Sequence, residues 1–204
     1  MSKQEDLKKL MEKMESDDSL PLKTNETNLV FGVGNPDTKI LFIGEGPGYW
    51  ENLKKEPFVG NAGKFLDQLL RSIDIPREDV YITNVVHHRP PENRDPEPSE
   101  IAAYGEYLDE IIRIISPEVI ITLGRFSMGK FLPEARISST HGKVHRVNWG
   151  GRELIVIPMY HPAASLRNGE IMRQEKEDFL ALPEMLEEIK KEEPKEKTEQ
   201  MELI

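Results

Sequence analysis

The stretch from Lys39 to Leu70 reads KILFIGEGPGYWENLKKEPFVGNAGKFLDQLL and decides the fold. Four apolar residues, Ile40 to Ile43, predict a buried strand, and the glycine-rich segment GEGPG ends it. A second glycine-bounded segment, Pro57 to Gly63, leads into an apolar-periodic helix over residues 62–73. A strand that a glycine-rich loop connects to the N-terminus of a helix is typical of ligand sites at the carboxyl edge of an open α/β sheet.

The rest of the chain alternates between strand and helix patterns. Several of the strands are apolar on both faces, which indicates an α/β fold with a parallel or mixed sheet covered on both sides. We expect a helix that is capped by Ser99, runs to about Ile115 and exposes Glu100, Glu106 and Asp109 to water. The other elements are expected as strands at 80–83, 119–123, 145–149 and 153–158, and as helices at 125–131 and 178–189.

The chain divides into three segments by composition. Residues 1–18 have apolar residues at helical spacing and predict an N-terminal helix. Residues 19–190 are expected to form one domain, since 204 residues suffice for a single substantial core. Residues 191–204 are charged and poor in apolar residues, so we expect a disordered tail.

Composition excludes several classes of function. The sequence has no cysteine, which excludes disulfides, thiolate zinc sites and an ordinary cysteine-ligated iron–sulfur cluster. No apolar run approaches the roughly 20 residues of a membrane span, and the first residues lack an apolar signal region, so we expect a cytoplasmic protein. The net charge of −10 argues against nucleic-acid binding, but over half of it lies in residues 1–18 and 184–204.

Glu45, Asn84, Gly124 and His161 each follow an apolar strand closely. If these strands run parallel, their carboxyl ends converge on one rim of the sheet, which indicates a site. No shared metal is expected from the neighbouring His87 and His88, because adjacent strand residues point to opposite sides.

Each candidate side chain has two interpretations. Glu45 either caps loop N–H groups or orients water and steadies a developing positive charge. Asn84 either forms an Asx turn or reads the edge of a planar heterocycle. His161 is either structural or functional, and Phe58 is either a hydrophobic plug or a face on which a base stacks.

Four segments together resemble the uracil-DNA glycosylase superfamily, and more narrowly its family 4 type. They are GEGPGYWENLKKEPFVGNAGKFLD, VYITNVVHHRPPENRDPEPSEI, VIITLGRF and MYHPAASLRN, in order between residues 31 and 186. The resemblance implies a three-layer αβα sandwich with a short, mostly parallel central sheet. It also implies a monomeric, nucleoid-associated enzyme that removes uracil from DNA and leaves an abasic site for base excision repair.

The resemblance also implies roles around the base. Phe58 would stack on the flipped uracil, and Asn84 would read its Watson–Crick edge. The backbone N–H of Gly46 would contact a uracil carbonyl, Glu51 would crowd C5 against the thymine methyl, and His161 would stabilise the leaving anion at O2.

The sugar and the DNA backbone have their own candidates by the same resemblance. Glu45 would steady the cationic sugar or position water, with Asn93 as a second candidate for the water. Leu166 would press into the minor groove as an apolar wedge. The expected phosphate contacts are Lys64, Arg89, Arg94, Ser165 and Arg167.

The sequence departs from the family pattern in ways that matter. Family 4 enzymes carry four cysteines for a [4Fe–4S] cluster, and those positions fall near Asp17 and Leu20, at His88 and at Tyr104, none of which is a thiol. We therefore expect no cofactor, with Leu20, His88 and Tyr104 packing in its place. Two further departures are Asn52, where an Asp is usual, and Lys55, where a Gly is usual.

Three other functions stay open from the sequence. One is a non-catalytic protein of the same fold that binds uracil-containing DNA, and another is a glycosylase for a different deaminated base such as hypoxanthine. The third is an unrelated nucleotide-binding protein, against which the absence of a G-x-x-x-x-G-K-[ST] motif argues.

Overall fold

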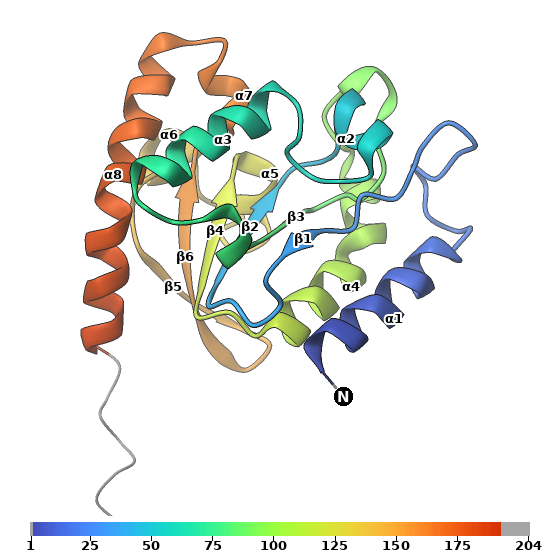
Figure 1. Cartoon of the computed structure of the whole chain (residues 1–204), viewed down its shortest axis with the longest axis horizontal. Coiled ribbons are helices and arrows are strands. Elements are labelled where there is room, and N and C mark those ends of the chain that lie inside the picture. Colours follow the sequence, from blue (N-terminus) through green and yellow to red (C-terminus); the bar gives the residue numbers. More distant parts are fainter. Residues whose placement is uncertain (1, 193–204) are drawn as a thin grey trace, which may run out of the picture.

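A six-stranded sheet in the order β1-β3-β2-β4-β6-β5 forms the middle layer of the computed structural model, which describes residues 2–192 (Figure 1). The inner strands β2, β3, β4 and β6 are parallel, whereas the edge strands β1 and β5 pair antiparallel with their neighbours. This confirms the mostly parallel sheet, and the two strands predicted at 145–149 and 153–158 form an antiparallel pair. The strands are β1 (Val33–Gly34), β2 (Ile40–Gly44), β3 (Tyr81–Asn84), β4 (Val119–Leu123), β5 (His145–Trp149) and β6 (Arg152–Met159).

Helices cover both faces of this sheet, which confirms the three-layer sandwich. Helices α1 and α4 lie on one face, and α3 and α8 lie on the other (Figure 1). The α-helices are α1 (Lys3–Glu15), α2 (Tyr49–Lys54), α3 (Asn61–Ser72), α4 (Pro98–Ile115), α5 (Arg125–Gly129), α6 (Ile137–Thr140), α7 (Pro162–Ser165) and α8 (Gly169–Glu192), and the 3-10 helices are η1 (Arg77–Asp79) and η2 (Pro91–Asn93).

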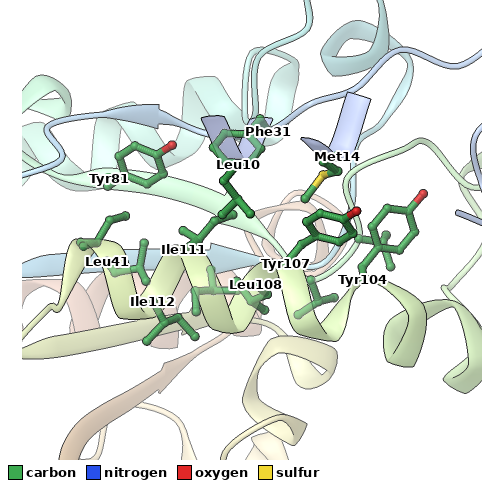
Figure 2. Packing of buried hydrophobic residues seen from close by; sticks show 14 of the residues in the cluster. Leu10, Met14, Phe31, Leu41, Tyr81, Tyr104, Tyr107, Leu108, Ile111 and Ile112 are labelled. Carbon is green, nitrogen blue, oxygen red and sulfur yellow. The ribbon is translucent and has the colours of Figure 1, made fainter. Parts of the chain in front are cut away.

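The two cores follow from the alternation of side chains along the strands. In β2, Leu41 and Ile43 belong to the cluster under α1 and α4, whereas Phe42 belongs to the cluster under α3 and α8. In Figure 2, Leu10 and Met14 of α1 approach the same core as the side chains of α4. Each fully buried side chain of this kind contributes about 1.5–3 kcal/mol, so α1 is docked on the domain by packing.

Helix α4 begins two residues earlier than its sequence predicts, and one of its acids points inward. Pro98 is its first residue and Glu97 its N-cap, not Ser99. Glu100 was expected on the wet side but is buried, because both of its carboxylate oxygens accept from the guanidinium of Arg94 at 2.8 and 2.6 Å.

Helix α8 is also longer than predicted, starting at Gly169 instead of residue 178. The predicted tail at 191–204 lies, from residue 193 onward, outside the described residues. Between residues 2 and 192, no helix is long and apolar enough to cross a membrane.

Candidate active site at the rim of the sheet

The carboxyl ends of β2, β3, β4 and β6 meet at one rim of the sheet, as the sequence predicts. Glu45 follows β2, Asn84 ends β3, Gly124 follows β4 and His161 lies just beyond β6. A cavity of about 280 Å³ opens at this rim. Nine of the predicted site residues line it: Glu45, Gly46, Glu51, Phe58, Asn84, Asn93, Arg94, His161 and Arg167.

Asn84 lies in this cavity with an unmet hydrogen-bonding need. Its side chain is 1% exposed, and its Oδ1 atom has no hydrogen-bond partner among residues 2–192. A buried acceptor left unpaired costs about 1–3 kcal/mol. A β-carbon on Gly44 would lie 2.4 Å from this oxygen, so only glycine leaves room for it. The arrangement indicates a ligand that donates a hydrogen bond to Oδ1.

Phe58 presents an aromatic ring beside that amide. The residue is buried and has a φ of +54°, a conformation that bulky residues rarely adopt. Its ring lies 5.6 Å from the His161 ring, at an interplanar angle of 28°. Backbone strain of this kind is found at functional sites, where the surrounding structure stabilises it.

Glu45 is held in the cavity with its carboxylate largely stripped of water. Oε1 accepts from the backbone N–H of Phe126 at 3.3 Å. Burial raises the pKa of Glu45 to about 7, an effect that the Phe126 N–H partly opposes. Gly124 has a φ of +103°, and a β-carbon there would lie 2.3 Å from Oε1, so this glycine also makes the placement possible. A carboxyl group with a pKa near neutrality suits a general base.

His161 is a neutral imidazole in a defined tautomer. It is the N-cap of α7, and its Nδ1 atom accepts from the backbone N–H of Ala163 at 3.1 Å. Burial lowers the pKa of His161 to about 4, and the positive charge of Arg167 lowers it further. Because Nδ1 is an acceptor, the ring proton of the neutral form is on Nε2, which is left to donate to a ligand.

Glu51 has a structural task that the sequence did not reveal. Its carboxylate accepts from the backbone N–H groups of Gly48, Val59 and Gly60, at 3.2, 2.9 and 2.7 Å. It thereby joins both ends of the glycine-rich loop. Its predicted contact with C5 of the base stays a prediction.

The proline-rich loop supplies the outer wall of the cavity. Asn93 has a φ of +56° and accepts from Nε of Arg89 at 2.7 Å. Arg94 lines the cavity, but its charge is compensated by Glu100 and Glu97, which weakens the prediction that it contacts phosphate.

The predicted DNA contacts are placed unequally. Arg167 is exposed and lines the cavity, and Leu166 next to it in the chain is 45% exposed, as a wedge requires, whereas Lys64 is exposed on α3 but is not among the lining residues. Ser165 is a correction: it is buried and its hydroxyl donates to the buried carboxylate of Glu175, so its side chain does not face a phosphate.

Sequence reasoning missed several groups around the cavity. Asp95 lines it and forms an ion pair with Arg125, and the Phe126 N–H fixes Glu45. The position of Gly124 directly after β4 could have pointed to Arg125 and Phe126, because the residues that follow this strand end lie at the same rim.

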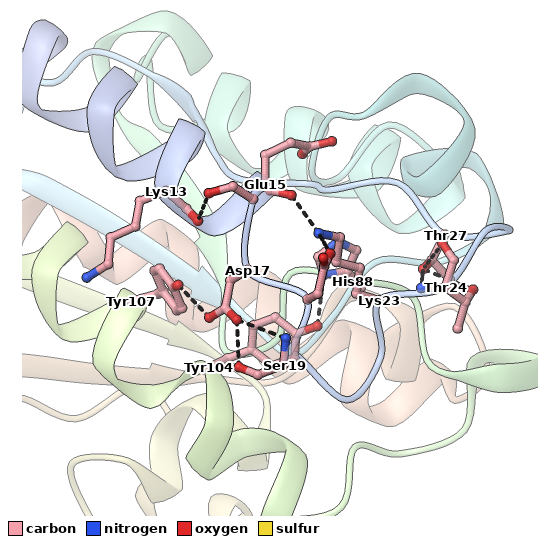
Figure 3. Close-up of polar contacts among 12 residues, drawn as sticks. Lys13, Glu15, Asp17, Ser19, Lys23, Thr24, Thr27, His88, Tyr104 and Tyr107 are labelled. Carbon is pink, nitrogen blue, oxygen red and sulfur yellow. Dashed lines mark hydrogen bonds and ion pairs between the residues drawn. The ribbon is translucent and has the colours of Figure 1, made fainter.

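A second polar cluster occupies the positions where the resemblance places the cluster cysteines (Figure 3). Nδ1 of His88 and the Tyr104 hydroxyl are 2.8 Å apart, and the Tyr107 hydroxyl donates to Asp17 at 2.7 Å. Leu20, His88 and Tyr104 are all buried, which confirms the predicted packing. These groups include no thiolate and therefore do not fit a four-cysteine cluster. Within the described chain, no three His, Cys, Asp or Glu side chains gather as a metal site.

Comparisons with known proteins agree with this geometry. The family model of the uracil DNA glycosylase superfamily matches residues 31–182. The type-4 uracil-DNA glycosylase of Archaeoglobus fulgidus is 46% identical over 169 residues, which are 80% of this chain and 85% of that protein. The Thermotoga maritima enzyme of the same name is 49% identical over 149 residues (72% and 77%), and that of Sulfurisphaera tokodaii is 42% identical over 185 (88% and 84%). The chain therefore belongs to the uracil DNA glycosylase superfamily.

Proposed function

We propose that this protein excises uracil from DNA by hydrolysing the N-glycosidic bond between base and deoxyribose, leaving an abasic site. The observation that carries the proposal is the buried, unpaired Oδ1 of Asn84. N3–H of uracil is a donor that satisfies it, and the Asn84 amide N–H₂ donates to O4. Cytosine presents an acceptor at N3, which would leave two buried acceptors facing each other.

The chemistry proposed for the site stabilises two opposite charges. As the bond breaks, its electron pair goes to N1 of uracil and the sugar becomes oxocarbenium-like. Nε2–H of His161 donates to O2, over which the negative charge spreads, without His161 itself becoming protonated. In this proposal the carboxylate of Glu45 stabilises the cationic sugar and takes the proton of the water that attacks C1′. Asn93 is the second candidate to hold that water.

The DNA is proposed to lie across the cavity mouth, with the uracil nucleotide extruded into it. Leu166 takes the place of the extruded base, while Arg167, Lys64 and Arg89 contact phosphates. Gly46 and Glu51 border the base, so a methyl group at C5 would press on the loop that Glu51 anchors. We propose that a single chain suffices for this binding.

We further propose that the protein works without an iron–sulfur cluster or any other cofactor. His88 and Tyr104 hydrogen-bond to each other and are both buried, as is Leu20, so this region is held by ordinary hydrogen bonds and apolar contact. The iron content of the purified protein and its absorption near 400 nm test this directly. Stoichiometric iron would contradict it.

The activity is tested with an oligonucleotide that carries one uracil, followed by alkaline scission of the abasic site, in EDTA. We expect cleavage at uracil and none at thymine or cytosine in the same context. His161→Ala should lower the rate by roughly 10²–10³-fold, whereas His145→Ala, on the far edge strand β5, should not. Binding without cleavage by the wild-type protein would make it a reader of uracil, and cleavage at hypoxanthine instead would change the substrate.

A further inference from the structure

Helix α2 exposes three large apolar side chains beside the cavity. Tyr49, Trp50 and Leu53 are 53%, 53% and 58% exposed, and the helix buries none of its residues. Their spacing places them on one side of the helix. Soluble proteins seldom leave such a group of aromatic and aliphatic side chains in water without a partner for it.

The exposed side is held rigidly from behind. Glu51 accepts three backbone N–H groups of the loop, and the Asn52 carboxamide accepts from the N–H of Asn28 at 2.7 Å and donates to the Glu26 carbonyl at 3.1 Å. The polar residues in the middle of α2 are therefore used for anchoring. The fold therefore leaves the apolar face of α2 exposed to solvent in a fixed orientation.

The two aromatic rings form a preorganised pair. Tyr49 and Trp50 are in T-shaped contact, with ring centroids 5.2 Å apart and an interplanar angle of 82°. This is a geometry that aromatic pairs prefer, so the rings hold each other in place. Exposed rings fixed in this way offer flat surfaces to a planar ligand at little cost in side-chain entropy.

Three cations and two acids lie around the pair. The Arg89 guanidinium lies over the Tyr49 ring, 5.4 Å from its centroid, and Lys54 and Lys55 are exposed at the end of the same helix. These three cations outweigh Glu56 and Glu51, and Glu51 is bound to loop N–H groups, so in a chain of net charge −10 this small local excess of cations favours a polyanion over an apolar protein surface. Aromatic rings interleaved with cations are typical of single-stranded nucleic-acid sites.

The face is continuous with the cavity. Gly48 and Glu51 of the α2 segment line one wall, and Ala163 and Arg167 of the α7 segment line another. Exposed apolar side chains thus flank the cavity from two segments, Leu166 beside α7 and the aromatic pair on α2.

We propose that Tyr49 and Trp50 form a stacking platform for an unpaired nucleobase next to the target nucleotide on the same strand. The proposal rests on the proposed function for its geometry, and it assigns α2 a second base site outside the uracil cavity. Arg89, Lys54 and Lys55 contact the phosphates next to the stacked base. The platform therefore favours uracil in single-stranded DNA, where neighbouring bases are free to stack on protein.

The first test needs no catalysis. Trp149→Phe leaves Trp50 as the one tryptophan of the two in the sequence. Binding of single-stranded oligothymidine without uracil is followed by the anisotropy of a dye on the DNA. At saturation we expect the Trp50 fluorescence to be quenched. Full binding with unchanged fluorescence would overturn the proposal, and so would a dimer in light scattering that Trp50→Ala abolishes.

The second test compares kinetics on single-stranded and duplex substrates. Trp50→Ala should raise KM for single-stranded uracil DNA by roughly 5- to 100-fold, with kcat nearly unchanged, and Trp50→Phe should restore most of it. Leu53→Ala is the matched control, equally exposed on the same helix, and should have little effect. Equal losses in Trp50→Ala and Leu53→Ala would overturn stacking.

A third test changes the substrate together with the protein. Replacing the neighbouring base by an abasic spacer should weaken DNA binding by the wild-type protein but cause little further loss of binding in Trp50→Ala. Additive losses would overturn the proposal. Absence of uracil cleavage by the wild-type protein would instead refute the proposed function, while the fluorescence test would still decide on the platform.

Discussion

The cavity at the rim and the region around His88 and Tyr104 both contain buried polar side chains, but the side chains at the centre of each differ in their hydrogen bonding. In the region around His88, Nδ1 of His88 pairs with the Tyr104 hydroxyl, and the partly exposed Asp17 accepts from Tyr107, while Nδ1 of the neighbouring His87 has no partner within the described residues. In the cavity, the Asn84 oxygen has no partner within the described residues, and burial holds the pKa of Glu45 near 7. Paired buried groups stabilise a fold, whereas unpaired ones cost stability and are available to a ligand. The comparison predicts that mutations in the two regions separate activity from stability.

The largest effect is expected from Asn84→Ala. Uracil excision should fall at least a hundredfold, comparable with the loss of a preorganised donor in other enzymes. The melting temperature should stay level or rise, because the substitution removes an unpaired buried oxygen. Asn148→Ala, an exposed asparagine on β5, is the control and should change neither quantity. A cooperative loss of stability in Asn84→Ala would contradict the proposed contrast.

Tyr104→Phe should give the opposite result. It leaves His88 without its hydroxyl partner inside the protein, at a cost of about 1–3 kcal/mol in the free energy of unfolding. Excision should be nearly unchanged at a temperature where the variant is folded. Denaturant unfolding of Tyr104→Phe beside Tyr49→Phe, whose ring is exposed, measures the difference. A catalytic defect in folded Tyr104→Phe would show that the two regions are coupled.

The pH dependence sharpens the role of Glu45. Its ionised form is the base, so kcat/KM should rise with pH and level off above about 7, and Glu45→Gln should remove this rise. His161, with a pKa of about 4, should add no titration between pH 5 and 8. A pH profile with a limb near 6.5 that survives in Glu45→Gln would contradict the assignment.

Glu45 should also make the fold less stable as pH rises. Its pKa is higher in the folded than in the unfolded state, so between the ordinary value of 4.5 and about 7 the unfolded state loses its proton first. Stability from this group is therefore present below 4.5 and lost by about 7. Glu45→Gln should be more stable than the wild type at pH 8, on the order of 2–3 kcal/mol, with the gain vanishing near pH 4.5. Chemical unfolding at both pH values measures it.

The smallest effect concerns Lys55, which ends α2 with a φ of +59°. A glycine avoids the cost of this left-handed conformation, so Lys55→Gly should raise the unfolding free energy by about 1 kcal/mol. The usual glycine of the family has this physical reason. Thermal unfolding of Lys55→Gly beside Lys54→Gly, where the backbone is helical and the sign should reverse, provides the check.

The sequence predicts the rim well because its logic is local. Glu45, Asn84 and His161 each lie at the end of an apolar strand, and parallel pairing alone brings such ends together. Features that depend on a distant partner were not predictable. Glu100 is buried because Arg94 reaches it, and Ser165 is buried because Glu175 points inward from α8. That inward acid also interrupts the apolar spacing in the first turns of α8, which is why the sequence predicts a helix only from residue 178.

The most direct test measures single-turnover excision of uracil, thymine and cytosine by wild type and Asn84→Ala, with circular dichroism on the same samples. We predict excision of uracil alone by the wild type, and a loss of at least a hundredfold in a variant that is as well folded. Uracil excision that survives in folded Asn84→Ala would contradict the account, because the unpaired oxygen would then not be the group that recognises the base.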